Sequence, residues 1–420
     1  MKMRSMKRKG SLLFILIFFW SNNLFAQDTL NLKPEIQFDF IKEQSNEIVN
    51  SATLSGFYEK LYQLKKTKKG KINIVHIGDS HIQADLLTHT VRQLLQKQFG
   101  NAGRGFIFPG RIARTNEPQS IYSSSAGNWE AKRIVFINQP LPIGLGASTV
   151  RTTQVDAKFI VRTLNSPTLD YSFDGISVFY QKDFACFNLI LKDSVGHPLA
   201  YAGPYTFESY PNFSFVELPY PVHQIEFQTS QPTPNQNQFT LFGLNLTKND
   251  AGVIYHSIGG NGAKFRHYLE AKFFFEQTKA LDPDLFIISL GTNEAIEYPY
   301  IDKQFSEQAD NFVKRLKEAN PNSLFLITTP SDFYRKRTRR NPGVESIHSL
   351  LIQFADKNSF ASWDLYNVLG GKHSADRWKK NNFLQSDGIH STRAGYELQG
   401  NLLYQALMKG YNEYVRYRYP

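Results

Sequence analysis

The sequence predicts an α/β fold that an all-β segment interrupts. A buried strand, a sharp turn and a helix follow one another between residues 72 and 100, which is how an α/β unit begins. From about Ile112 to Leu246 the sequence has short alternating apolar runs and no helical period. From Val253 onward, strands and helices alternate again. The simplest architecture is therefore one α/β domain with an inserted β domain.

The first α/β unit begins after a mixed, polar stretch. Residues 27–70 predict a helical lead-in, because Phe57, Leu61 and Leu64 have helical spacing. A buried strand is expected at 72–77, followed by the turn Gly78-Asp79-Ser80. The next helix should end at Gly100. Its apolar face consists of Leu87, Val91, Leu94 and Leu95.

The interrupting segment predicts several short strands. Clusters of turn-forming residues separate the strands at 193–198 and 231–235. Short strands divided in this way are typical of a β-sandwich or jelly roll. The strands are expected at 175–180, 187–191, 225–228 and 239–246.

The rest of the chain completes the α/β domain. Strands are expected at 253–258, 284–290 and 323–328, and helices at 265–281, at 305–319 and from Thr392 to about Met408. The predicted domain boundaries are 27–111 and 249–420 for the two parts of the α/β domain and 112–248 for the inserted β-sandwich.

Residues 1–26 have the pattern of an export signal. A positively charged start precedes the apolar run 12–20, and Ala26 is a small residue suited to cleavage. The run is shorter than the ~20 residues that span a bilayer. We therefore expect cleavage without stable membrane insertion, and a periplasmic or secreted protein of the bacterial cell envelope.

The charge of the chain is moderately basic. Without the signal, 43 basic residues stand against 37 acidic ones, a net charge of about +6. Much of this excess lies in the run 335–340. The run is either a solvated loop or a segment that attracts an anionic wall polymer. Nucleic acid is not an expected partner of an exported protein.

Cysteine and histidine usage argues against metal and cofactor chemistry. Cys186 is the single cysteine, so neither an intrachain disulfide nor a thiolate metal cluster can form. No pair of histidines has a metal-ligand spacing with a third ligand nearby. His76, His81 and His89 are therefore expected in the core or in loops, with lining of the pocket as the alternative for His81, and we expect no metal and no cofactor.

Ser80 has the position that a nucleophile needs. It follows a buried strand and opens a helix, whose first N–H groups can stabilise an oxyanion. A serine hydroxyl is a weak nucleophile until a base removes its proton. The alternative is that Asp79 or Ser80 is only a helix N-cap.

The candidate base is His390, in the segment Ser386-Asp387-Gly388-Ile389-His390. A carboxylate three residues earlier, Asp387, can hold one ring nitrogen and leave the other for a serine. The pair precedes the last helix of the α/β domain. The alternative is a loop hydrogen bond without catalytic meaning.

Two further segments can supply oxyanion donors. Residues 259–263 (Gly-Gly-Asn-Gly-Ala) and 291–294 (Gly-Thr-Asn-Glu) each follow a predicted strand. Backbone N–H groups and the side-chain amide of Asn293 would together make an oxyanion hole. Each segment is alternatively only a turn. The carboxyl ends of the strands in an open α/β sheet are where such groups meet.

The blocks Ser, Gly, Asn and Asp-x-x-His in this order resemble the SGNH (GDSL) hydrolase superfamily. The resemblance implies a three-layer α/β/α fold with Ser80 as nucleophile and Asp387 and His390 as its partners. It also implies that Gly262 and Asn293 join the Ser80 N–H in the oxyanion hole. Glu294 departs from the common Gly-x-Asn-Asp block.

A narrower resemblance is to bacterial peptidoglycan O-acetylesterases. It rests on the segments 78–85 (Gly-Asp-Ser-His-Ile-Gln-Ala-Asp), 103–106, 257–263 and 291–295. Those enzymes carry a carbohydrate-binding-like β domain between the first and second blocks, where the insertion is predicted here. The resemblance implies a Ser-His-Asp acyl-enzyme mechanism acting on O-acetylated glycan, with the 6-position of muramic acid in peptidoglycan as the expected target.

Four alternatives remain open at this stage. The chain could act on another acetylated polysaccharide, hydrolyse lipid esters, or transfer the acetyl group to a second sugar. It could also be a glycan-binding protein without activity. An exposed apolar groove would favour the lipid esterase.

Overall fold

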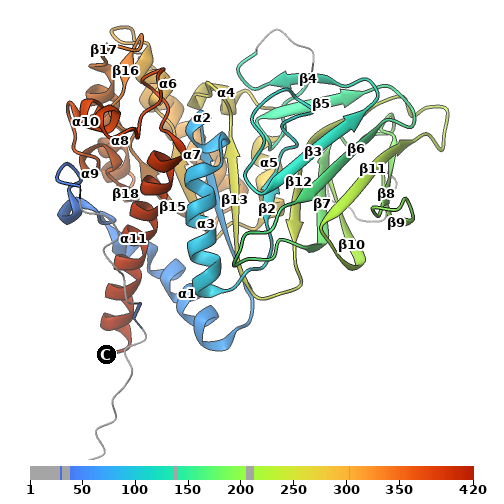
Figure 1. Cartoon of the computed structure of the whole chain (residues 1–420), viewed down its shortest axis with the longest axis horizontal. Coiled ribbons are helices and arrows are strands. Elements are labelled where there is room, and N and C mark those ends of the chain that lie inside the picture. Colours follow the sequence, from blue (N-terminus) through green and yellow to red (C-terminus); the bar gives the residue numbers. More distant parts are fainter. Residues whose placement is uncertain (1–28, 31–37, 137–140, 205–211, 302) are drawn as a thin grey trace, which may run out of the picture.

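A computed structural model describes residues 29–30, 38–136, 141–204, 212–301 and 303–420 (Figure 1). The predicted export signal at 1–26 lies outside these residues. None of the described helices is long and apolar enough to cross a membrane.

A five-stranded parallel sheet forms the centre of the α/β part, in the order β13-β1-β14-β15-β18. Its strands are buried on both faces, as parallel strands between helices usually are. In β1, Ile72 and Ile74 face one hydrophobic core, and Val75 and Ile77 face another. The strands are β1 (Lys71–Gly78), β13 (Gly252–Gly259), β14 (Leu285–Ser289), β15 (Leu324–Thr328) and β18 (Ala361–Trp363).

Helices cover both faces of this sheet, which gives three layers (Figure 1). The first core is shared with α1 (Ser55–Thr67), α3 (Leu86–Phe99) and α11 (Arg393–Arg418). The second is shared with α4 (Phe265–Leu269), α5 (Phe274–Thr278), α7 (Phe305–Ala319) and α8 (Gly343–Lys357). Shorter elements are α2 (Ser80–Gln83), α6 (Thr292–Ile296), α9 (Leu365–Val368), α10 (Ser374–Lys380) and the 3-10 helices η1 (Glu43–Ser45), η2 (Ser51–Leu54) and η3 (Lys279–Leu281).

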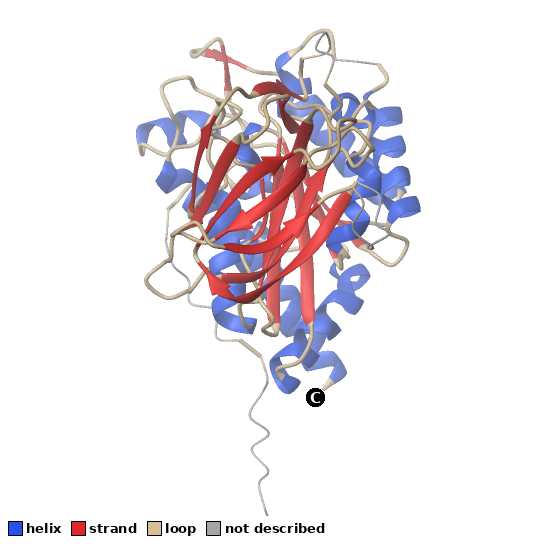
Figure 2. Ribbon diagram, turned by 90° about the vertical axis from the view of Figure 1, so that its right-hand side faces the viewer, coloured by secondary structure: helices blue, strands red, loops and turns tan. Residues whose placement is uncertain are grey.

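Two antiparallel sheets are built from the strands between Gly105 and Thr247 (Figure 2). A third core joins them, with Val178 and Leu244 from one sheet and Phe159 and Phe227 from the other. One sheet contains β2 (Gly105–Ile107), β4 (Glu130–Arg133), β5 (Ser148–Thr152), β7 (Phe173–Tyr180), β10 (Phe213–Val222) and β12 (Phe239–Thr247). The other contains β3 (Ile121–Ala126), β6 (Lys158–Thr163), β8 (Asn188–Lys192), β9 (Pro198–Ala202) and β11 (Gln224–Ser230).

The four strands predicted in this segment are confirmed as β7, β8, β11 and β12. The described residues between β2 and β12 contain no helix, as expected. Sequence reasoning missed the other strands. In β3, for example, three consecutive serines at 123–125 hide the alternation of apolar and polar residues.

The antiparallel sheets rest directly on the α/β part. Strand β2, which lies before residue 112, pairs with β12 and packs beside β13. Phe106, Phe179 and Phe242 belong to the same core as Phe265 and Phe274 of α4 and α5. The two parts are therefore joined by a continuous apolar contact beside β13 and the helices that follow it.

The single helix predicted at 265–281 is wrong. The structure has α4, α5 and η3 instead. The chain bends between α4 and α5, where the Phe273 N–H donates to the Ile143 carbonyl in the antiparallel part at 3.1 Å. A contact between segments so far apart in sequence is invisible to helical periodicity.

The last helix is ten residues longer than predicted, because α11 continues to Arg418. Its added turns are held by burial of Tyr411 against Phe99 and by a hydrogen bond from the Tyr414 hydroxyl to Glu59. The basic run forms a hairpin of β16 (Tyr334–Arg335) and β17 (Arg339–Arg340).

Candidate active site

Ser80 lies at the sharp turn between β1 and α2. Asp79 is the N-cap, and its Oδ1 accepts a hydrogen bond from the His81 N–H at 2.9 Å. The turn needs glycine at position 78, because a Cβ there would lie 2.7 Å from the Ser289 carbonyl oxygen. Asp79 performs the capping, so the Ser80 hydroxyl is left for another partner.

That partner is His390, which approaches from the opposite end of the chain. The Ser80 Oγ lies 2.9 Å from His390 Nε2, and His390 Nδ1 lies 2.7 Å from Asp387 Oδ2. The Asp387 Oδ1 also accepts the N–H groups of Ile389 and His390, at 2.8 and 3.0 Å. A ring nitrogen in this position can accept the serine proton, and the carboxylate fixes which nitrogen is free to do so.

The loop around Asp387 keeps this carboxylate ionised. Burial raises the pKa of Asp387, but the hydrogen bond with His390 and those from the Ile389 and His390 N–H groups outweigh it, and the net pKa is lowered. Gly388 has φ = +75°, which lets the loop close within four residues. An ionised carboxylate is the form that orients an imidazole and stabilises the imidazolium.

The Gly-rich segment after β13 lies against the serine turn. The Gly260 N–H donates to the Gly78 carbonyl at 3.2 Å, and a Cβ on Gly259 would lie 2.1 Å from the Gln83 nitrogen. Gly262 has φ = +77°. Among the described residues, neither the Gly262 N–H nor the Ser80 N–H has a hydrogen-bond partner. Both are therefore available to an oxyanion.

Asn293 connects this segment to the serine turn. Its Nδ2 donates to the Ala263 carbonyl at 3.0 Å and lies 3.4 Å from Asp79 Oδ2. The structure thus brings the three predicted blocks Gly-Asp-Ser, Gly-x-Gly and Gly-Thr-Asn together at the carboxyl ends of β1, β13 and β14. This is the edge at which an open α/β sheet places its site.

The unusual Glu294 is a structural link between two of these segments. It is buried, and its Oε1 accepts the Phe265 N–H at the start of α4 at 3.1 Å. Burial raises the pKa of Glu294 to about 7. The bond fixes α6, which carries Asn293, relative to the helix that follows Gly262.

A polar cleft of about 380 Å³ opens at the Ser80 hydroxyl and the His390 ring. Four carboxamide side chains line it, and sequence reasoning identified none of them: Asn116, Gln119, Asn261 and Gln385. Arg393 orients one of these amides by donating to Gln119 Oε1 at 3.0 Å. Asn261 lies in the Gly-rich block at 259–263, whereas the other three amides belong to no shared motif, so no sequence pattern brings the four together.

His81 borders the pair of His390 and Asp387, in keeping with the alternative that it lines the pocket. Its ring centroid lies 5.1 Å from that of His390, and its Nδ1 is 2.9 Å from the buried Tyr396 hydroxyl. Burial lowers the pKa of His81, although Asp79 partly offsets this, so the ring stays neutral beside His390. Tyr396 was not singled out in the sequence.

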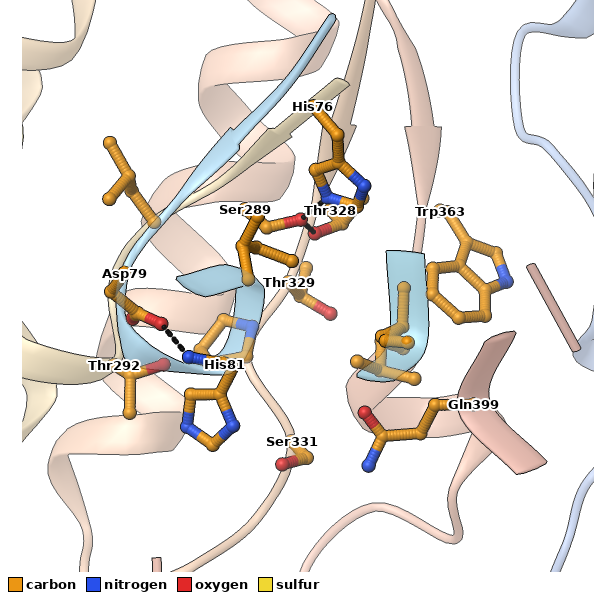
Figure 3. A pocket seen from close by; sticks show the side chains of 15 residues that line it. His76, Asp79, His81, Ser289, Thr292, Thr328, Thr329, Ser331, Trp363 and Gln399 are labelled. Atoms are coloured by element: carbon orange, nitrogen blue, oxygen red, sulfur yellow. Dashed lines mark hydrogen bonds between the residues drawn. The ribbon is translucent and has the colours of Figure 1, made fainter. Parts of the chain in front are cut away.

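A second, smaller cavity of about 40 Å³ lies behind the serine turn (Figure 3). His76 borders it, with Nε2 at 2.6 Å from the Ser289 Oγ, which in turn bonds the Thr328 Oγ1 at 2.6 Å. Burial lowers the pKa of His76 to about 3. The cavity has room for only a few water molecules. It is too small for a sugar.

The described residues contain no group of three or more His, Cys, Asp or Glu side chains arranged to hold a metal ion. Around Ser80 the structure brings together a hydroxyl, an imidazole, a carboxylate and N–H donors.

The chain is similar to known proteins in part of its sequence and in its fold. The model of the GDSL-like Lipase/Acylhydrolase family matches residues 230–398. A solved structure described as "Peptidoglycan O-acetylesterase in action, 5 min" aligns over 88% of this chain and 99% of that one, with a TM-score of 0.72 and 19% identity. A family two carbohydrate esterase from Clostridium thermocellum aligns over 66% and 97% of the two chains, with a TM-score of 0.29 and 11% identity. No curated protein sequence matches the chain.

The family-model match over residues 230–398 and the shared fold indicate a carboxylic ester hydrolase that resembles the SGNH (GDSL) hydrolases. Within this class the chain resembles peptidoglycan O-acetylesterases, and the resemblance noted from the sequence motifs is confirmed in the fold over most of the chain.

Proposed function

We propose that the chain is a secreted serine esterase that removes O-acetyl groups from a cell-wall glycan, namely from the muramic acid 6-position of peptidoglycan. The observation that carries the proposal is the line of hydrogen bonds from Ser80 through His390 to Asp387, at 2.9 and 2.7 Å. Three side chains so aligned at the opening of a cleft are the arrangement that activates a serine.

In the first half-reaction, the Ser80 Oγ attacks the acetyl carbonyl carbon while His390 Nε2 takes the hydroxyl proton. Negative charge develops on the carbonyl oxygen. The N–H groups of Ser80 and Gly262 and the Asn293 Nδ2 stabilise it. As the tetrahedral intermediate collapses, His390 returns the proton to the departing sugar oxygen, and an acetyl-serine ester remains.

In the second half-reaction, water replaces the sugar. His390 removes a proton from water, the resulting hydroxide attacks the acetyl-serine carbonyl, and acetate leaves as Ser80 regains its proton. Asp387 stays ionised throughout and stabilises the imidazolium that forms twice per cycle. Neutral His81 beside His390 adds no competing positive charge.

The lining of the cleft supports a glycan over a lipid. Carboxamides both donate and accept hydrogen bonds, and so match sugar hydroxyls, whereas an acyl chain would leave them unpaired at a cost. Most of the side chains that line the cleft at Ser80 are polar. The shared fold with a peptidoglycan O-acetylesterase and the motif Gly-Asp-Ser-His-Ile-Gln-Ala-Asp at 78–85 support peptidoglycan as this glycan.

We also propose that the two antiparallel sheets are an inserted β-sandwich domain, with the boundaries 112–248 expected from the sequence, or a start nearer Gly105 if β2 is counted with its partner β12. Their shared core supports a sandwich. Loop residues Asn116 and Gln119 reach the cleft from this part of the chain. The insertion therefore shapes the substrate site. Export across the inner membrane, through residues 1–26, would bring the enzyme to its substrate.

Acetate release tests this function. Wild type and Ser80→Ala are incubated with O-acetylated peptidoglycan, acetylated xylan and a lipid ester, and acetate or fatty acid is quantified. Wild type should release acetate faster from peptidoglycan than it releases product from the other two substrates. Ser80→Ala should lose a factor on the order of 10⁴ or more in kcat. Ser386→Ala, an exposed neighbour of the catalytic loop, should retain activity.

Equal rates for wild type and Ser80→Ala would refute the triad. Preferential release from xylan or from the lipid ester would keep the triad and refute the substrate.

A further inference from the structure

A group of exposed cations stands beside the catalytic loop and has no role in the mechanism above. Its members, named here the basic rim, are Lys336, Arg337 and Arg339 of the β16–β17 hairpin and Arg377 and Lys380 of α10. Figure 1 shows the hairpin and α10 at the same end of the molecule as α2 and α6, the helices that carry Ser80 and Asn293.

The rim is attached to the loop that carries Asp387 and His390. The Tyr334 N–H donates to the Gly388 carbonyl at 2.7 Å. The packing is so close that a Cβ on Gly388 would lie 3.1 Å from the Arg337 carbonyl oxygen. The hairpin therefore holds a fixed position two residues from His390.

The hairpin and α10 are also tied to each other. The Tyr334 hydroxyl and the Arg340 guanidinium both bond to Asp376 of α10, and Arg340 also contacts His373. Asp376, the acidic residue that α10 presents to the hairpin, is therefore already paired with Tyr334 and Arg340. Among the described residues, none of the five members of the rim forms an ion pair.

Five uncompensated positive charges at one edge of an enzyme raise the local concentration of anions. Because the hairpin has a fixed position relative to Ser80, the anionic groups that it attracts must lie at a fixed distance along the substrate from the acetyl ester. A polymer whose acetyl ester reaches Ser80 would extend past the catalytic loop, and Arg side chains there are suited to carboxylates. A freely solvated loop would need neither the Tyr334–Gly388 bond nor the Arg340–Asp376 pair.

We propose that the basic rim binds carboxylate groups of an anionic glycan polymer while one of its acetyl esters occupies the cleft at Ser80. This inference rests on the proposed function and adds the charge of the substrate to it. The rim acts on the polymer and not on the ester, so a small neutral ester gains nothing from it.

The test compares two triple variants that each remove three positive charges. Lys336→Gln/Arg337→Gln/Arg339→Gln alters the rim. Lys68→Gln/Lys69→Gln/Lys97→Gln alters exposed lysines near the amino end of β1, at the other end of the sheet. The value of kcat/KM is measured for acetate release from O-acetylated peptidoglycan and for hydrolysis of p-nitrophenyl acetate, at 20 and 300 mM NaCl.

The rim variant should lose about tenfold in kcat/KM on peptidoglycan at low salt and nothing on p-nitrophenyl acetate. Salt should lower the wild-type value to that of the variant, since ~0.3 M salt screens exposed charges within several ångströms. Amidating the peptidoglycan carboxylates should have the same effect as the variant. The charge-preserving Lys336→Arg/Arg337→Lys/Arg339→Lys should restore most of the activity, which excludes a folding defect.

Equal losses in the two triple variants, or a wild-type rate on peptidoglycan that neither salt nor amidation changes, would overturn the inference. If wild type releases no acetate from peptidoglycan, the proposed substrate fails. The rim is then tested alone, by co-sedimentation of Ser80→Ala with an insoluble polyuronate. Loss of binding in the rim variant only would support the proposed binding of carboxylates by the basic rim. Binding that is equal in both variants, or that occurs to DNA and not to polyuronate, would refute it.

Discussion

Asp387 accepts three hydrogen bonds from a loop of four residues, and under the proposed mechanism these bonds orient His390 as the base. Two come from backbone N–H groups and one from the imidazole. The chain contains another Asp–His pair, His348 Nε2 and Asp364 Oδ1 at 2.9 Å, but its partners do not include a serine hydroxyl. The presence of an Asp–His bond is therefore not enough, and its alignment with Ser80 is decisive.

We expect Asp387→Asn to lower kcat for acetyl-ester hydrolysis by a factor of about 10³–10⁴, because an amide at this position favours the wrong imidazole tautomer. The matched control is Asp364→Asn, which disrupts the other pair and should leave kcat unchanged. Steady-state kinetics on p-nitrophenyl acetate measure both. A comparable loss in the two variants would contradict the assignment of His390 and Asp387.

The five predicted site residues could be named from sequence because each lies in a short motif. The structure places His390 within hydrogen-bond distance of both Ser80 and Asp387, and Asn293 beside Ala263. The amides of the cleft could not be named. Asn116 and Gln385 are ordinary loop residues until the fold brings them to one opening.

At the scale of elements, Asp85 is the junction between the two parts of the fold. It is buried with φ = +52° at the N-cap of α3. Its carboxylate accepts hydrogen bonds from Arg92 at 2.7 Å, from Arg104, and from the Gln119 N–H at 3.1 Å. It thereby fixes the loop that brings Gln119 to the cleft.

We expect Asp85→Ala to lower the free energy of unfolding by about 3–5 kcal/mol, because it leaves two buried guanidinium groups without their counter-charge. Glu318→Ala removes one partner of an exposed pair with Lys314 and should cost less than about 1 kcal/mol. Urea denaturation followed by circular dichroism measures both. Similar midpoints for the two variants would show that the buried cluster contributes little.

Helices and strands were predictable where the local sequence pattern alone determines the secondary structure. The helix at 305–319 is confirmed to the residue as α7, since its apolar stripe repeats with helical period. The helix predicted at 265–281 is interrupted where the Phe273 N–H bonds to the Ile143 carbonyl. The cause of the break is therefore a contact with a residue more than a hundred positions away in the sequence.

At the scale of the whole molecule, buried histidines make stability sensitive to acid. Burial lowers the pKa to about 3 for His76 and His256, and to about 4 for His89 and His267. In the unfolded chain these groups titrate near 6.5, so the unfolded state binds protons first as the pH falls. The contribution of these neutral histidines to the free energy of unfolding is therefore complete above pH ~6.5. It decreases as the pH falls toward their pKa values in the folded state.

We therefore expect the urea midpoint to fall between pH 7.5 and pH 5, where Asp85, with its lowered pKa, still remains ionised. Each histidine contributes up to about 1.4 kcal/mol per pH unit below 6.5. The double variant His76→Gln/His256→Gln should be less stable at pH 7.5 but show a shallower decline. A constant wild-type midpoint across this range would contradict the expectation.

The contact between Ser80 and His390 joins residues 310 positions apart. Under the proposed mechanism, a ribosome-bound chain that has exposed Ser80 but not yet residues 387–390 has a nucleophile with no base. Hydrolytic competence thus appears only after residues 387–390 have been made, and a product cut short before residue 387 would be inert toward acetyl esters. The order of the motifs along the chain therefore delays the activity until the segment with Asp387 and His390 has been synthesised.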